Sequence, residues 1–253
     1  MTYCILGHCA ATGQTGIAYT TVTLAGGGTS PFYSYDGDIV VVQAYGNIRT
    51  AIAGARALDQ GSSPDAAVAL MADVDPAFEH RQIGIMCRDG RLVARTGMNA
   101  RPWAGHQTGD DYIAMGNVLV GSSVVEAMAT VFKSSKGDSL AERLLVALEA
   151  GRAQGGQLAP GDVQYDERSA LLKIMGAGPD MDAVPALDLR VDMHGDAVSE
   201  LRRIYGIYKP VIARRANRAA NPASDLPTSE WEAMHMASNP PPPALRPSGD
   251  PKI

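Results

Sequence analysis

Residues 1–23, MTYCILGHCAATGQTGIAYTTVT, form the stretch from which the fold can be inferred. Thr2 to Cys9 places its side chains alternately on two faces, which predicts a β-strand. Gly16 to Leu24 is rich in β-forming residues, so we expect this segment to return antiparallel after a turn. With a tight turn, Thr2 lies beside the region of Thr21 to Thr23.

The rest of the chain carries strand and helix patterns in blocks. Strands are expected at residues 38–43, 81–87, 91–97, 111–116, 169–175 and 186–191. Helices are expected at residues 48–58, after Ser63, from Ser122 or Ser123, after Ser139, and from Asp196 to Gly206. These blocks differ from strict βαβ alternation and favour antiparallel sheets covered by helices.

The composition limits the possible classes of function. The chain has 253 residues, a formal net charge of −5 and a sequence pI near 5.5, which argues against a nucleic-acid surface. Its three cysteines, Cys4, Cys9 and Cys87, show neither a disulfide framework nor metal-binding spacing, so no metal or cofactor is expected. No apolar run is long enough to span a membrane, and the first residues lack a signal-peptide pattern. A cytoplasmic location is therefore expected.

Proline marks a change in organisation near the end of the sequence. The periodic pattern fails after about Arg218, and prolines gather between Pro222 and Pro251. Such a segment is a poor core former. We therefore predict one domain at residues 1–218 and an extended or disordered Pro-rich tail at residues 219–253.

Thr2 is the first candidate for catalysis. It follows Met1 and is small enough for this methionine to be removed in a cell. Removal leaves a hydroxyl and a free α-amine on one residue, and an unperturbed α-amine has a pKa of roughly 7.7–8.0. The amine can then act as the base for the hydroxyl, so one residue supplies both nucleophile and base. An accidental threonine at position two is the alternative.

Five further residues are candidates for the site. Asn117 follows a glycine at a strand end and could donate a hydrogen bond to an oxyanion, although a turn asparagine is the alternative. Trp103 could form a pocket wall and His106 a polar contact to a ligand. The alternative is that the aromatic side chain only packs over its loop. Gln43, at the end of a buried strand, is expected to contact substrate, and Ser169 is a candidate only through a family resemblance.

Seven stretches between Thr2 and about Tyr205 together resemble one bacterial family, the domain of unknown function 1028. They include MTYCILGHC, TGQTGIAYTT, RQIGIMCRDGRLVARTG and, as the most specific, PWAGHQTGDDYIAMGNVLVG. The family is placed among the N-terminal-nucleophile (Ntn) hydrolases. The resemblance implies an α+β fold, a four-layer αββα sandwich of two antiparallel sheets flanked by helices. It also implies amide hydrolysis through an acyl-enzyme, with Thr2 matching the Thr or Ser that opens family members.

One segment departs from the pattern of that family. Relatives usually carry aspartate after a pair of glycines, where this chain has Gln157, and glutamine where it has Arg168. An insertion separates the two positions. If the segment contacts substrate, the substrate or the activity differs here, and only Ser169 is carried over from it as a site residue.

These observations predict an amidohydrolase that acts on a small amide or acyl compound. A non-catalytic module that binds a small ligand on the same fold is the alternative. Neither nucleic acid nor membrane is expected as a partner, and a homo-oligomer such as a dimer stays open.

Overall fold

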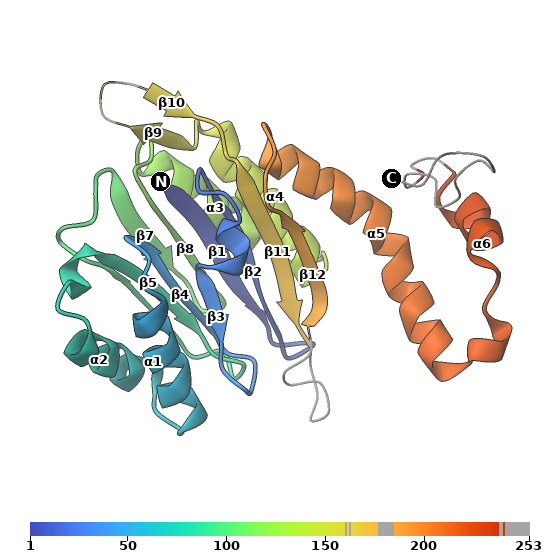
Figure 1. Ribbon diagram of the computed structural model, residues 1–253, viewed down its shortest axis with the longest axis horizontal. Helices are drawn as coiled ribbons and strands as arrows, with labels where there is room; N and C mark the ends of the chain where they lie inside the picture. Colours follow the sequence, from blue (N-terminus) through green and yellow to red (C-terminus); the bar gives the residue numbers. More distant parts are fainter. Residues whose placement is uncertain (160, 162, 177–184, 238–239, 241–253) are drawn as a thin grey trace, which may run out of the picture. The chain divides into compact units, whose positions relative to one another are not determined.

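A computed structural model describes residues 1–159, 161, 163–176, 185–237 and 240 (Figure 1). The chain divides into two compact units, Met1–Leu201 and Arg202–Ile253, which are described separately. Within the described residues, no helix is long and apolar enough to cross a lipid bilayer.

The larger sheet of the first unit has six antiparallel strands. In spatial order they are β12 (Pro185–Val191), β11 (Ser169–Met175), β2 (Gln14–Thr21), β1 (Thr2–Cys9), β8 (Tyr112–Asn117) and β7 (Ala104–Thr108). Thr2 pairs with Thr21 on one side, which confirms the predicted return of the chain, and with Asn117 on the other. The first strand therefore lies inside the sheet and has neighbours on both edges.

The second sheet has four antiparallel strands. In spatial order they are β3 (Pro31–Tyr33), β4 (Ile39–Ala44), β5 (Arg81–Met86) and β6 (Leu92–Thr96). The predicted hairpin of β5 and β6 is confirmed, and Gly90 in its turn has a φ of 87°, a value that glycine tolerates best. A separate pair of short strands is formed by β9 (Gln157–Ala159) and β10 (Val163–Tyr165).

The two larger sheets share one apolar cluster. Its members come from both sheets and include Cys4, Leu6, Ile17, Ile39, Val41, Met86, Ile113 and Met115, all buried. Alternation along β1 therefore turns Cys4 and Leu6 toward the second sheet, and Tyr3 and Ile5 toward the other side. Each fully buried side chain of this size contributes about 1.5–3 kcal/mol to folding.

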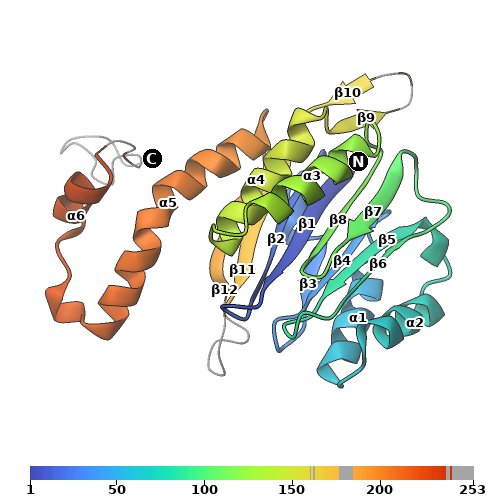
Figure 2. The ribbon, with the colours of Figure 1, turned by 180° about the vertical axis from the view of Figure 1, so that it is seen from behind.

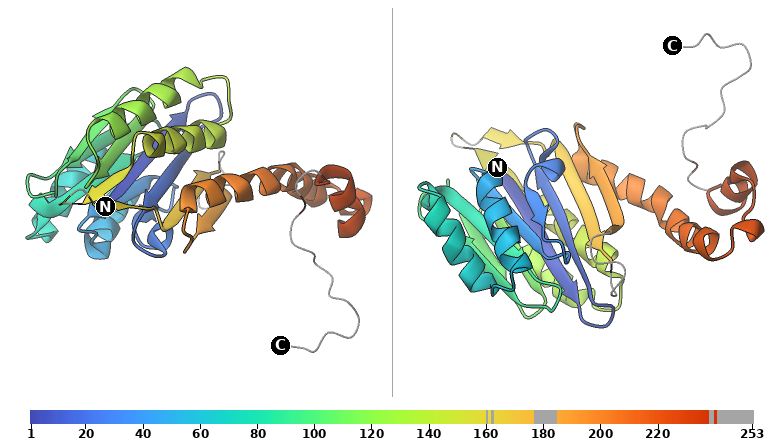
Figure 3. Two further views of the ribbon diagram at one scale, coloured as in Figure 1. Left: turned by 90° about the horizontal axis from the view of Figure 1, so that it is seen from above. Right: turned by 60° about the horizontal axis from the view of Figure 1, so that its bottom comes forward.

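Helices cover the outer face of each sheet (Figures 2 and 3). The six-stranded sheet is covered by α3 (Ser123–Ser134) and α4 (Leu140–Ala153), and the four-stranded sheet by α1 (Ile48–Asp59) and α2 (Pro64–Val74). The caps predicted at Ser63 and Ser139 are confirmed, because their hydroxyls accept hydrogen bonds from the backbone N–H groups of Ala66 and Glu142. The result is a mixed α+β unit with antiparallel sheets.

Helix α5 (Ala197–Ala220) begins in the first unit and continues in the second. Its predicted cap is confirmed, since Asp196 Oδ1 accepts a hydrogen bond of 3.1 Å from Ser199 N. The predicted end at Gly206 is wrong, because the helix continues through Gly206 and Pro210. Glycine and proline cost a helix interior about 1 and 3 kcal/mol, but the alanines and arginines that follow are strong helix formers.

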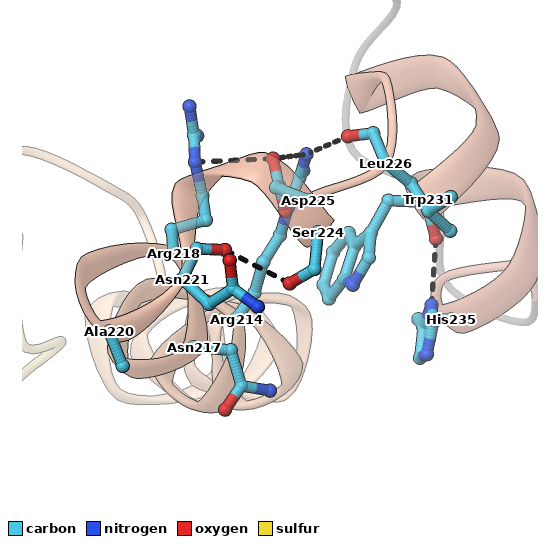
Figure 4. A pocket seen from close by; sticks show the side chains of 10 residues that line it. All are labelled: Arg214, Asn217, Arg218, Ala220, Asn221, Ser224, Asp225, Leu226, Trp231 and His235. Atoms are coloured by element: carbon cyan, nitrogen blue, oxygen red, sulfur yellow. Dashed lines mark hydrogen bonds and ion pairs between the residues drawn. The ribbon is translucent and has the colours of Figure 1, made fainter.

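The predicted extended tail is also wrong for α6 (Thr228–His235). In the second unit, the Arg214 guanidinium donates two hydrogen bonds of 2.9 Å to Asp225 and lies 4.7 Å from the centre of the Trp231 ring (Figure 4). Trp231 in turn stacks on His235 at 4.8 Å. These contacts stabilise a short helix, which the high proline content of the surrounding sequence did not predict. Residues 238–239 and 241–253 of the predicted tail lie outside the described residues.

Candidate functional site

A row of polar side chains crosses one end of the six-stranded sheet. Ser169 pairs with Thr21, Thr21 with Thr2, and Thr2 with Asn117. Directly opposed residues of an antiparallel ladder point to the same face, so these side chains share the face that looks toward the second sheet. Thr2 therefore lies in the middle of a polar row, at the end of an otherwise apolar interface.

The hydroxyl of Thr2 is held in a defined direction by Thr21. Thr21 Oγ1 donates its single proton to the carbonyl oxygen of Met1 at 2.7 Å, since a carbonyl can only accept. In the 3.0 Å contact between the two threonine hydroxyls, Thr2 must therefore be the donor. The Thr23 N–H also donates to Thr21 Oγ1 at 3.3 Å. Thr21 thus lies between the hydroxyl of Thr2 and the group attached to the Thr2 nitrogen.

Two cavities adjoin this end of the sheets. The first, of about 220 Å³, is lined by Thr2, Tyr19, Thr21, Thr23, Thr29, Ser30, Gln43, Ala44, Gly46 and Ile48. The second, of about 120 Å³, is lined by Met1, Ala44, Tyr45, Arg101, Asn117, Val118 and Ala159. Ala44 lines both, and the consecutive residues Met1 and Thr2 line one each. A ligand that reaches Thr2 therefore has space on both sides of the bond between these two residues.

Gln82 of the second sheet fixes the amide groups beside Thr2. Its Nε2 donates to the backbone carbonyls of Gly105 at 3.0 Å and Gly116 at 2.9 Å, which cannot donate in return. Its Oε1 is therefore an acceptor, and it accepts from Gln43 Nε2 at 2.7 Å and from Asn117 Nδ2 at 3.2 Å. Two backbone carbonyls thus determine the orientation of three side-chain amides.

One consequence concerns Asn117, for which the sequence predicts a donor to an oxyanion. Its nitrogen is bonded to Gln82, and its buried Oδ1 has no partner among the described residues. Asn117 pairs with Thr2 across the ladder and lines the cavity that contains Met1. In this arrangement Asn117 has a free acceptor beside the start of β1.

The backbone is strained at two residues of the cavity walls. Ala44 and Val118 both have positive φ angles, 74° and 56°, and they directly follow the buried amides Gln43 and Asn117. For residues other than glycine, this left-handed backbone conformation costs about 1–2 kcal/mol. The backbone therefore leaves the regular strand conformation directly after Gln43 and directly after Asn117.

Electrostatics keep the Tyr19 hydroxyl and the Cys4 thiol, both near Thr2, in their protonated forms. Burial raises the pKa of Tyr19 to about 12, so its hydroxyl stays protonated and shares a 2.8 Å hydrogen bond with Ser30. Burial also raises the pKa of the Cys4 thiol well above its usual range. At the chain end, burial and then the charge of Arg101 lower the pKa of the Met1 α-amine. Within the described residues, no group of three or more possible metal-binding side chains occurs.

Of the predicted site residues, the structure brings Thr2, Gln43 and Asn117 together. The other three line neither cavity. Trp103 packs over Gly105, where an added Cβ would lie 2.6 Å from its ring, and His106 Nδ1 shares a 2.9 Å hydrogen bond with Thr96. Desolvation lowers the pKa of His106.

Ser169 serves the loop beside the first cavity. Its hydroxyl donates to Thr23 O at 2.7 Å and accepts from Gly26 N at 3.1 Å, so both of its main hydrogen-bonding functions are used. Ser169 therefore holds the segment that contributes Thr23 to the cavity wall, while its own side chain does not line the cavity.

Sequence reasoning missed Thr21, Tyr19, Ser30 and Gln82 as parts of the site. Thr21 was within reach, because the predicted register already placed it beside Thr2. The signal for Gln82 was weaker: like Gln43, it is an amide at one end of a run of apolar strand residues. Only the packing of the two sheets shows that both amides face Asn117.

Comparisons with known proteins agree with the resemblance seen in the sequence. A sequence model described as "Family of unknown function (DUF1028)" matches residues 2–201. The chain is similar to the crystal structure of protein SPO2555 from Silicibacter pomeroyi, itself assigned to DUF1028, with 28% identity, 82% of this chain and 89% of that chain covered, and a TM-score of 0.71.

A second solved structure is far less similar. It is Anbu (ancestral beta-subunit) from Yersinia bercovieri, with 12% identity, 85% of this chain and 97% of that chain covered, and a TM-score of 0.35. A score this low supports no conclusion about the present chain. No curated protein matches the sequence.

Proposed function

The chain belongs to the DUF1028 family, and from the geometry around Thr2 we propose that it is an N-terminal threonine amidohydrolase acting on a small amide. One observation carries the proposal. The Thr2 hydroxyl lies at a cavity wall, oriented by Thr21, and the nitrogen of the same residue becomes a free amine when Met1 is removed.

The proposal includes the architecture of the first unit. Two antiparallel sheets share an apolar cluster, and a pair of helices covers the outer face of each. We propose that these elements form the four-layer αββα sandwich of the Ntn hydrolases, with the nucleophile at the start of β1. This placement gives Thr2 a rigid strand as its support.

The proposed reaction uses both functional groups of Thr2. The neutral α-amine takes the hydroxyl proton, directly or through the Thr21 hydroxyl, while Thr2 Oγ1 attacks the amide carbonyl carbon. The C–N bond then breaks, the leaving nitrogen takes the proton, and an ester to Thr2 remains. Water, deprotonated by the same amine, hydrolyses this ester and restores the hydroxyl. Removal of Met1 also frees the Thr21 proton from the Met1 carbonyl, so Thr21 can pair with the new amine.

For Asn117 we propose a role as an acceptor. Its unpartnered Oδ1 suits an N–H group of the free α-amine and would orient the amine lone pair toward the Thr2 hydroxyl. Its role as a donor to an oxyanion stays a prediction. The nitrogen that would donate already forms a hydrogen bond to Gln82 Oε1.

A second function is favoured by one specific observation. With Met1 attached, the Thr2 nitrogen is part of a peptide bond, and Thr21 already donates to the Met1 carbonyl. A chain that keeps Met1 lacks the base. It then fits a binding module that holds a small ligand in the cavity beside Thr2, without turning it over.

The experiment combines intact mass with two variants at one position. Thr2→Ser and Thr2→Ala both carry a small residue that permits removal of Met1, so all three proteins can be compared with a free amine at residue 2 once their masses show this removal. Each is screened with small amides for released amine, after its mass has been measured. We expect activity in wild type and Thr2→Ser, none in Thr2→Ala, and similar melting temperatures. Full activity in Thr2→Ala ends the proposal, and a retained Met1 in protein from the native host favours the binding module.

A further inference from the structure

The charges around the two cavities have one sign. Among the described residues that line them, Arg101 is the single charged side chain and no acidic residue occurs. Arg101 also has no carboxylate partner within the described part of the chain, in contrast to Arg81 and Arg143 of the same unit, which pair with Asp75 and Asp111. A cation of this kind attracts an anionic group into the site.

Arg101 is held at the cavity by its backbone and by an aromatic neighbour. Its carbonyl accepts from Val118 N at 3.3 Å, directly after Asn117. Its guanidinium lies 5.4 Å from the centre of the Tyr45 ring, and Tyr45 lines the same cavity. The guanidinium is also near enough to the chain end for its charge to act on the Met1 amine.

A buried amide on the strand that contributes Ala159 to this cavity also lacks a partner. Gln157 is fully buried, and neither its Oε1 nor its Nε2 has a hydrogen bond among the described residues. It lies two residues before Ala159 on β9, so both side chains leave the strand on the same face, and Ala159 lines the cavity. The backbone bond from Leu158 N to Val118 O, 3.0 Å long, places β9 next to the segment that Arg101 contacts.

From these observations we propose that the cavity beside Met1 binds the carboxylate of an anionic amide, with Arg101 as its charged partner and Gln157 as an amide donor. The inference rests on the proposed function for the identity of the reaction. The binding site itself does not depend on turnover. The preferred substrate class is thus an amide that carries a free carboxylate on the side of the molecule that enters the space vacated by Met1.

A test by binding separates this site from the reaction. The protein is Thr2→Ala, verified by mass to lack Met1, and the probes are glutarate and glutaramide, a dianion and a neutral diamide of equal chain length. We expect calorimetric titration to show glutarate binding in preference to glutaramide, with affinity that falls on addition of salt. Adding Arg101→Gln should raise the Kd for glutarate by about tenfold to a hundredfold. Adding Arg101→Lys instead should raise this Kd by a smaller factor, because the positive charge is kept.

The matched control for Arg101 is Arg56→Gln, an exposed arginine on α1 that lines neither cavity. Its affinity for glutarate should equal that of the parent. Absence of glutarate binding, equal binding of glutaramide, or an unchanged affinity in Arg101→Gln overturns the proposal. Glutarate binding that depends on Arg101, in a protein whose Thr2 form hydrolyses no amide, would leave this site standing and reject the proposed reaction alone.

Gln157→Met tests the second contact by two readouts. Methionine has nearly the same shape and removes an unpartnered buried amide, so the free protein should keep or gain stability. If the amide contacts the carboxylate, glutarate affinity falls by about threefold to tenfold in the same variant. An unchanged affinity removes Gln157 from the site.

Discussion

Replacing Gln82 by methionine tests the amide network that connects the two sheets beside Thr2. Gln82 is fully buried and accepts from Gln43 and Asn117, neither of which has another hydrogen bond from its amide nitrogen within the described residues. Methionine has a similar length and volume, so the substitution removes the hydrogen bonds with little change in packing. Two buried amide donors are left without partners.

The magnitude follows from these two donors. Each buried donor left unsatisfied costs about 1–3 kcal/mol, so Gln82→Met should lower the free energy of unfolding by about 2–6 kcal/mol. The carbonyls of Gly105 and Gly116 lose one bond each but belong to strands that offer ladder partners, so they are left out of this sum. Against a typical total of about 5–15 kcal/mol, such a loss is large.

The assay is urea unfolding followed by circular dichroism, and the expected change is a lower midpoint at an unchanged m-value. Gln107→Met is the matched control. It is the same substitution on the neighbouring β7, where Gln107 is half-buried and donates a single 3.2 Å bond to the Tyr112 hydroxyl. We expect the control to lose at most about 1.5 kcal/mol. A loss in Gln82→Met below about 1 kcal/mol, or equal to that of the control, would refute the orientation derived for Asn117 and Gln43.

Three further predictions follow from the same region and from Asp75 at the end of α2. Thr21→Val should lower the rate of amine release at least about tenfold, and Thr21→Ser should keep a rate near that of wild type, because a proton relay from the Thr2 hydroxyl through residue 21 to the amine needs a hydroxyl there. Equal rates in both variants would exclude Thr21 from proton transfer. Asn117→Asp should move the acid limb of the kcat/KM profile to higher pH, since a carboxylate beside the amine raises the pKa of the amine; an unmoved limb argues against contact. The hydrogen bonds from Arg81 hold the pKa of Asp75 well below its usual range, so this carboxylate contributes stability above about pH 4 that is lost as the pH falls through its folded pKa. Urea midpoints measured between about pH 2 and pH 7 should therefore fall less steeply on the acid side in Asp75→Asn, which is already less stable at pH 7.

The elements that could be predicted are those that depend on neighbours along the chain. The return of β2 beside β1, with Thr2 opposite Thr21, followed from alternation and a short turn. The caps at Ser63 and Ser139 followed from local residue preferences. In each case the residues that decide the structure lie within about twenty positions of one another, so a short stretch of sequence includes both partners of the interaction.

The parts that escaped prediction depend on distant partners. Strand β7 carries His106 and Gln107 in place of a β-branched apolar run, and its conformation comes from pairing with β8. Trp103 was an attractive pocket residue by type, yet the ring folds over Gly105 on the same segment. The role of Gln82 exists only once the two sheets have packed, because its partners come from β4 of its own sheet and from β7 and β8 of the other. No local pattern encodes such a set.

The positive φ angles at Ala44 and Val118 bear on how specificity in this protein could be altered. These residues directly follow Gln43 and Asn117, whose side chains are fixed by hydrogen bonds to Gln82, so the shape of the cavity rim is set when the chain folds and not when a ligand arrives. Ordering of that rim therefore does not reduce the free energy of ligand binding. Redesign for a different ligand should therefore leave the two backbone turns intact and vary the side chains that project from them and from the neighbouring loop, Tyr45 and Arg101 first.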